Sequence, residues 1–150
     1  MSLFLSCYEN RLDTKGRISV PAAFRSSLNS ETFAGVVLFR SFKHNCIEGL
    51  SMSRMEKIAS ASDQMGLFDD DLDNLTAMIF ADARPLQFDI TGRIIIPQDL
   101  LKHANITNKA LFVGRGNSFQ IWNPDDFAKT QTNSLNTLRK THPNLKINNQ

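Results

Sequence analysis

A nine-residue motif occurs twice in this chain of 150 residues, and the repeat limits the folds that the chain can adopt. Residues 13–21 read DTKGRISVP, and residues 89–97 read DITGRIIIP. The Asp, Gly, Arg and Pro of the two copies are separated by the same offset of 76 residues, and the apolar residues between them also match. The chain therefore contains an internal duplication, and we expect two similar halves.

Each copy of the motif predicts a tight turn followed by a short strand. The carboxylate of Asp13 can accept hydrogen bonds from amides two residues on, and Gly16 supplies a backbone angle that other residues resist. From Arg17 onward, polar and apolar residues alternate, which places the arginine on the polar face of a strand. Pro21 then ends the strand and suits the first turn of a helix. Asp89 and Gly92 have the same roles in the second copy.

The remaining elements follow from periodicity and capping signals. We expect strands at residues 3–8 and 85–88, with a turn from Glu9. Two hairpins are predicted, at 33–40 with 45–50 and at 109–113 with 118–122. Short helices are predicted at 21–28, 97–103 and 124–127. A further helix is expected to begin at the capping box formed by Ser53 and Glu56, and another is expected to follow the acidic residues 69–71.

These elements predict an α+β fold, mainly β, with two tandem halves at residues 7–54 and 83–126. An acidic helical connector, residues 55–82, joins them. Units of this size are too small to bury a core singly, so they should pack on each other about a pseudo-twofold axis. Residues 128–150 are rich in Asn, Thr and Lys, and we expect this tail to be disordered.

Charge is distributed unevenly along the chain, although the net charge is only +2. The connector holds one basic and seven acidic residues, and the tail holds four basic residues and no acidic one. Such segregation suits a protein that presents a basic face to a polyanion. A solvated acidic helix without a partner explains the connector equally well.

Composition indicates the compartment. The sequence contains no apolar run of eighteen residues and no secretory signal, so we expect a cytoplasmic protein without a membrane segment. Cys7 and Cys46 do not form a Cys-x-x-Cys pattern, which predicts two reduced, buried thiols.

Ile95 interrupts the alternation of polar and apolar residues along the strand of the second motif. It occupies the outward position that Ser19 holds in the first copy. A large aliphatic side chain on the polar face of a strand suggests a contact surface, and we assign Ile95 to an oligomer interface. The alternative is a single tolerated exposed residue.

The two motifs, followed by LFVG at 111–114 and FQIW at 119–122, closely resemble those of the MraZ family over about residues 1–127. These bacterial regulators contain two tandem SpoVT-AbrB-type domains. The resemblance implies a swapped-hairpin, double-psi-like barrel and a ring-shaped homo-oligomer, an octamer or larger. It also implies a nucleoid-associated regulator that binds short repeats in double-stranded promoter DNA, typically upstream of the division and cell-wall gene cluster.

The family's Asp-x-x-x-Arg motif falls on Asp13 with Arg17 and on Asp89 with Arg93. Lys15 of the first copy is replaced by Thr91 in the second. DNA contacts therefore rest more securely on the first copy, and the second copy is either a DNA contact or chiefly structural or oligomer-forming. The assigned DNA-binding residues are Lys15, Arg17 and Arg93, and the residues that support the motif are Asp13, Gly16, Asp89 and Gly92.

The chemistry of these side chains agrees with the resemblance. An arginine fork can bind guanine O6 and N7 or a phosphate, and a lysine at a turn is a point charge for phosphates. Asp13 is expected to shape the turn and to hold Arg17 or Arg93. Two alternatives remain: a purely structural ion pair for Arg17, and an oligomeric protein-interaction or antitoxin-like module in which the basic turns are incidental.

Other classes of site have weaker support. No nucleotide-binding or nucleophile motif is present, and we expect neither an enzyme nor a cofactor. His44 and Cys46 have no second pair of metal ligands nearby, so we expect no metal site. The acidic residues 69–73 lack the glycine and glutamate of a calcium loop and suit helix capping better.

Overall fold

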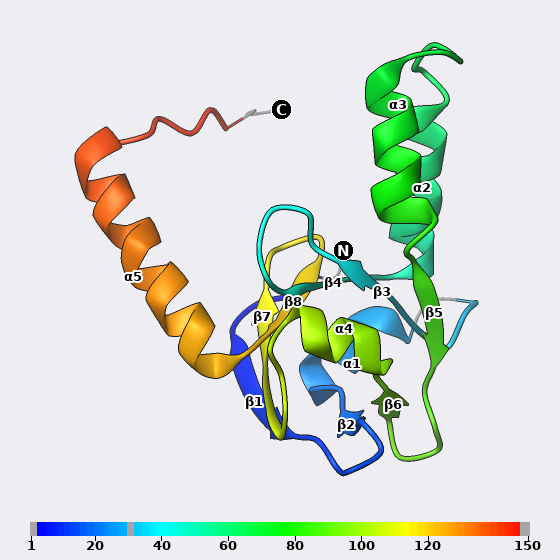
Figure 1. The fold of residues 1–150 in the computed structure, drawn as a ribbon, viewed down its shortest axis with the longest axis vertical. Helices are drawn as coiled ribbons and strands as arrows, with labels where there is room; N and C mark the ends of the chain where they lie inside the picture. Colours follow the sequence, from blue (N-terminus) through cyan, green and yellow to red (C-terminus); the bar gives the residue numbers. More distant parts are fainter. Residues whose placement is uncertain (1–2, 30–31, 148–150) are drawn as a thin grey trace.

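The computed structural model describes residues 3–29 and 32–147 (Figure 1). Its strands form a six-stranded and a two-stranded antiparallel sheet, so the predicted α+β class is confirmed. The strands are β1 (Cys7–Arg11), β2 (Arg17–Ser19), β3 (Gly35–Arg40), β4 (Ile47–Leu50), β5 (Arg84–Gln87), β6 (Arg93–Ile95), β7 (Lys109–Gly114) and β8 (Phe119–Trp122). The helices are α1 (Ala22–Leu28), α2 (Met52–Ser62), α3 (Asp70–Leu75), the π-helix η1 (Thr76–Phe80), α4 (Gln98–His103) and α5 (Pro124–Thr141).

The two halves exchange their first strands. The large sheet has the order β1-β7-β8-β4-β3-β5, so β1 pairs with the hairpin of the second half and β5 with the hairpin of the first. Tyr8 lies opposite Phe112, and Val36 lies opposite Leu86. Both predicted hairpins, β3–β4 and β7–β8, are present and meet along β4 and β8. The halves therefore form one structure and depend on each other for their sheets.

The two motif strands form a separate ribbon, β2–β6, whose ladder is symmetric about the pair Ile18 and Ile94. The Asn10 side chain of β1 donates a hydrogen bond to the Ser19 carbonyl of β2 at 2.7 Å, and β6 contacts β5. The ribbon thus adjoins both edges of the large sheet. Within the described residues the ladders form two sheets, and closure into a continuous barrel stays a prediction.

The predicted alternation of the motif strands is confirmed. Ile18, Val20, Ile94 and Ile96 are each 1% exposed and pack in the main core with the aromatic rings of Phe24, Phe112 and Phe119. Full burial of such an aliphatic side chain is worth about 1.5–3 kcal/mol, and a slip of one residue would expose the whole set. The core therefore fixes which side chains the ribbon presents to solvent.

The helices after the motifs begin where the prolines indicate. Pro21 precedes α1 and Pro97 precedes α4, and both helices bury apolar side chains beneath the ribbon: Phe24, Leu28, Leu100 and Leu101. Pro cannot donate a backbone hydrogen bond, so it fits this position without loss. Both helix predictions are confirmed.

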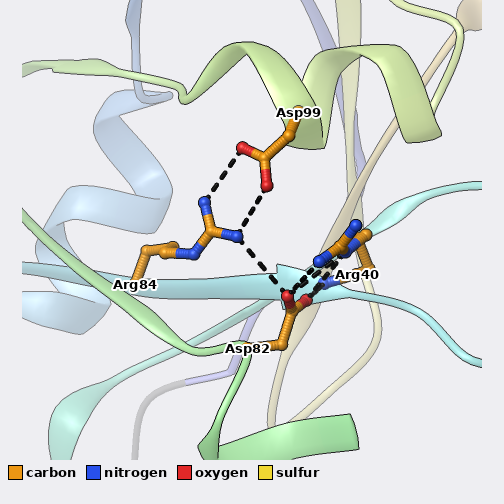
Figure 2. A network of polar contacts seen from close by, with 4 residues as sticks. All are labelled: Arg40, Asp82, Arg84 and Asp99. Atoms are coloured by element: carbon orange, nitrogen blue, oxygen red, sulfur yellow. Dashed lines mark hydrogen bonds and ion pairs between the residues drawn. The ribbon is translucent and has the colours of Figure 1, made fainter.

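An ion network anchors the connector to the sheet (Figure 2). Asp82, after η1, accepts hydrogen bonds from the Arg40 amide at 2.8 Å and from Arg40 Nη2 at 2.6 Å. Arg84 Nη2 bonds Asp99 of α4 at 2.6 Å and also reaches Asp82 at 3.4 Å. The Arg40 guanidinium lowers the pKa of Asp82, and Arg84 lowers the pKa of Asp99 to about 2. The network thus connects β3, the end of the connector, β5 and α4.

The start of the first connector helix differs from the prediction. Helix α2 begins at Met52, and Ser51 is its cap, with Oγ accepting from the Arg54 amide at 3.1 Å. The predicted capping box of Ser53 and Glu56 is therefore wrong, because the chain already turns directly after the buried end of β4. Asp69 caps α3 as expected, accepting from the Asp71 amide at 2.7 Å.

The first strand and one cysteine also depart from the prediction. Strand β1 runs from Cys7 to Arg11, where a turn was expected from Glu9, because its partner β7 extends to Lys109. Ser6 has a φ of 71°, which separates β1 from the isolated bridge at Phe4. Both cysteines are free, but Cys7 is exposed on this strand at the edge of the sheet, so the prediction of two buried thiols is wrong for it. Burial raises the pKa of Cys46 to about 12.

The prediction of a disordered tail is wrong for residues 128–141, which continue α5 to Thr141. Asn123 caps the helix as predicted, accepting from the Asp125 and Asp126 amides. No Gly or Pro interrupts the sequence until Pro143, and acidic residues in the first turn and basic ones in the last favour the helix dipole. Residues 148–150 of the predicted tail lie outside the described residues.

Candidate nucleic-acid interface

The first motif turn is held together by one carboxylate. Asp13 Oδ1 accepts hydrogen bonds from the amides of Lys15 and Arg17, both at 2.9 Å. Asp13 Oδ2 accepts from Arg17 Nε at 2.6 Å. Gly16 has a φ of 84°, the left-handed conformation that the motif predicts. Asp13 therefore shapes the turn and holds its own Arg17, while Lys15 lies exposed between them.

The second turn repeats this geometry. Asp89 Oδ1 accepts from the amides of Thr91 and Arg93, both at 2.9 Å, and from the Thr91 hydroxyl at 2.8 Å. Asp89 Oδ2 accepts from Arg93 Nε at 3.0 Å, and Gly92 has a φ of 79°. Thr91 thus stands where the first turn has the cation Lys15, and its hydroxyl adds a hydrogen bond to the Asp89 carboxylate.

Both carboxylates are firmly ionised. The hydrogen bond from the Arg17 amide, followed by the one from its side chain, lowers the pKa of Asp13. The Arg93 amide and then the Thr91 hydroxyl lower the pKa of Asp89. In each turn the carboxylate bonds the arginine through Nε, and among the described residues the terminal nitrogens of the two forks have no hydrogen-bond partner. Such a fork is oriented in advance for a bidentate acceptor.

The ladder fixes the neighbours of each arginine. Val20 donates to the Gly92 carbonyl at 3.1 Å and Ile96 to the Gly16 carbonyl at 3.0 Å. Since hydrogen-bonded and non-hydrogen-bonded pairs alternate, the pairs Arg17–Ile95 and Ser19–Arg93 are non-hydrogen-bonded, the kind with the closest side chains. All four side chains lie on the face opposite the buried isoleucines. We call these four residues the outer ribbon face.

Ile95 has the outward orientation that its position in the motif predicts, with 56% of its surface exposed. It lies directly opposite Arg17 on the outer ribbon face. It also borders a shallow surface depression lined by Phe33, Pro85 and Leu86. Its assignment to an oligomer interface stays a prediction.

Arg25 is a cation near the second turn that the sequence analysis missed. It belongs to α1, and a Cβ on Gly92 would collide with its guanidinium. The corresponding position above Gly16 is occupied by Leu101, which is 76 residues later in the chain. Arg25 Nε is buried, and among the described residues it has no hydrogen-bond partner. The second turn thus has a nearby cation from the first half in place of a lysine of its own.

His44, considered above as a metal ligand, lies in an aromatic contact. His44 packs against Trp122 with ring centroids 5.5 Å apart, and residues 3–29 and 32–147 contain no cluster of three or more potential metal ligands. Over the same residues, none of the helices is long and apolar enough to cross a membrane.

Comparison with known proteins agrees with this arrangement. Residues 3–77 and 79–145 each match the family model described as "MraZ protein, putative antitoxin-like". A protein of Pelagibacter ubique named "Transcriptional regulator MraZ" is 42% identical over 144 residues, which cover 96% of this chain and 93% of that protein. Proteins of the same name from Rickettsia akari and Gluconobacter oxydans are 43% and 40% identical, over 86% and 93% of this chain and 87% and 91% of their own lengths. These relatives carry the name of a regulator and not of an enzyme. The chain belongs to the MraZ family.

Proposed function

We propose that the protein is a transcriptional regulator that binds double-stranded DNA sequence-specifically through the outer ribbon face and its two flanking turns. One observation carries this proposal: Arg17 and Arg93 lie at pseudo-symmetric positions, each held through Nε by an exposed carboxylate. The name of the 42% identical relative, a transcriptional regulator, supports it.

The proposed contacts follow from the geometry of the side chains. A two-stranded ribbon can enter the major groove, where an oriented arginine fork reads guanine O6 and N7. Lys15 and Arg25 flank the ribbon as charges for the phosphate backbone. Asp13 and Asp89 support the forks and do not touch the phosphates, because carboxylates would repel them.

Assembly is the second part of the proposal. One protomer offers few cations, and non-specific DNA affinity lies around 10⁻⁴–10⁻⁶ M. A ring-shaped homo-oligomer that places several turns on several short repeats gains avidity, often about 10²–10⁴-fold. We therefore propose such a ring, built from swapped-hairpin barrels, acting at the nucleoid on repeats upstream of the division and cell-wall gene cluster. The exchange of β1 and β5 supports the barrel.

Fluorescence anisotropy over a salt series tests the proposal. The full chain should bind DNA from upstream of its own gene, and deletion of the repeats should remove that binding. Arg17→Ala should abolish the specific component. Lys15→Ala should weaken binding to every sequence and reduce the salt slope by about 0.9, the value for one phosphate contact. Normal binding by Arg17→Ala would show that the turn has been misassigned.

A protein-interaction module is the second candidate function. It is favoured by the tip of the connector, where Leu67 and Phe68 are 83% and 93% exposed next to acidic residues. Equal, weak and salt-sensitive binding to upstream and scrambled DNA would favour this function over specific regulation. A pull-down that depends on Phe68 would then identify the interaction surface.

A further inference from the structure

The outer ribbon face departs from the pseudo-twofold symmetry of the fold at one pair of positions. Its two arginines are equivalent, but the residue opposite Arg17 is Ile95, whereas the residue opposite Arg93 is Ser19. Both positions are exposed, so neither residue is needed to fill the core. The core side of the same ribbon is nearly symmetric, with isoleucine at both central positions. The asymmetry is thus confined to the face that points outward.

Directly opposite residues of a non-hydrogen-bonded pair have Cβ atoms about 4.5–5.5 Å apart. Ile95 therefore presents an apolar surface immediately beside the Arg17 fork. The major groove offers a matching pair of features, because guanine displays two acceptors and thymine displays a C5-methyl group. A guanine next to a thymine would satisfy both side chains at once.

We propose that Ile95 is a specificity-determining residue that contacts a thymine methyl beside the guanine read by Arg17. The proposal rests on the proposed function of the ribbon as a DNA-reading element. Ser19 has the equivalent position beside Arg93, and its hydroxyl can form a hydrogen bond with more than one kind of base. The two ends of the ribbon therefore read different bases, and the pseudo-symmetric protein binds its site in one orientation.

The charge beside Ile95 favours DNA over a second protein copy. A dry protein interface over Ile95 would also remove water from the adjacent Arg17, and its terminal nitrogens would then be buried without hydrogen-bond partners, which is costly. The Asp13 carboxylate bonds this arginine through Nε, which leaves the terminal nitrogens of the fork to be satisfied. The base edges of the major groove satisfy them with acceptors while the methyl group covers the isoleucine.

The test compares two DNA sequences and three proteins by fluorescence anisotropy. The DNA is the upstream fragment, either with its natural thymines or with every thymine replaced by deoxyuridine, which removes the methyl groups. The proteins are the wild type, Ile95→Ser, which makes the ribbon symmetric, and Ile147→Ser. The last is a matched control, because Ile147 is 75% exposed in the tail, outside the ribbon. Sedimentation velocity without DNA reports the assembly of each protein.

The wild type and Ile147→Ser should each lose roughly fourfold in affinity per contacted methyl on deoxyuridine DNA, the equivalent of one buried CH₂. Ile95→Ser should bind both DNAs equally while sedimenting like the wild type. Equal losses in all three proteins would overturn the proposal and leave the regulatory function standing. Altered sedimentation of Ile95→Ser would instead place Ile95 in an oligomer interface. If the wild type does not distinguish upstream from scrambled DNA, both the proposal and the function fail.

Discussion

Replacing Arg17 by lysine separates charge from geometry at the proposed DNA contact. Lysine keeps the positive charge but has no planar fork, so it cannot place two parallel donors on a guanine edge while a separate Nε–H holds Asp13. The Arg17–Asp13 pair has side-chain exposures of 37% and 36%. Exposed ion pairs contribute little to stability, so the fold should tolerate the change. The effect on DNA binding should be larger than the effect on stability.

The expected magnitude follows from the bonds that are lost. A bidentate pair to a base contributes about 1–3 kcal/mol of discrimination, which corresponds to roughly 5- to 150-fold in affinity for each ribbon engaged. Non-specific binding should change little, because the number of cations is unchanged. The slope of affinity against salt should also stay the same, in contrast to the reduced slope expected for Lys15→Ala.

Anisotropy titrations with upstream and scrambled DNA measure both quantities in one series. Arg139→Lys is the matched control, since Arg139 is exposed near the end of α5, away from both turns. The control should bind both DNAs like the wild type. If Arg17→Lys keeps the full preference for upstream DNA, Arg17 acts only as a charge and the argument from its oriented fork is refuted.

Two further predictions concern the fold and its response to pH. Gly92→Ala should destabilise the protein by about 1–2 kcal/mol in urea unfolding, because φ is 79° and the new Cβ would displace Arg25. The control Gly66→Ala should be close to neutral in the same assay, because the new Cβ would enter open space. Arg84 lowers the pKa of Asp99 from 3.8 to about 2, so this contact stabilises the fold above pH 4 and its contribution is lost as the pH falls toward 2. Asp99→Asn should therefore make the loss of stability between pH 4 and pH 2 shallower in urea titrations followed by circular dichroism.

The turns could be predicted from sequence because their chemistry is local. An Asp, a Gly three residues later and an Arg four residues later are enough to specify the hydrogen bonds of Asp13. The alternation of Ile18 with the polar Arg17 and Ser19 likewise predicts the buried face, and the match between the two motifs extends this prediction to Ile94. The helices after Pro21 and Pro97 followed from the same kind of short-range rule.

Features that depend on contacts between the halves could not be read from the motifs alone. Arg25 approaches the second turn only because the halves pack across the ribbon, although an offset of 76 residues relates it to Leu101 at the first turn. The length of β1 is set by its partner β7. The polar composition of residues 128–141 predicts disorder, whereas the absence of Gly and Pro before Pro143 allows α5 to continue to Thr141.

The arrangement of charge in three dimensions explains why a net charge of only +2 is compatible with DNA binding. Most of the acidic residues of the connector belong to the α2–α3 hairpin, which projects from the end of the molecule opposite the two turns (Figure 1). Charges are screened beyond about 10 Å at 0.1 M salt, so a distant acidic element does little to the potential at the turns. Asp82, which lies closer to the body, is paired with Arg40 and Arg84. Local charge at the outer ribbon face, and not the total, therefore determines how the turns interact with a polyanion.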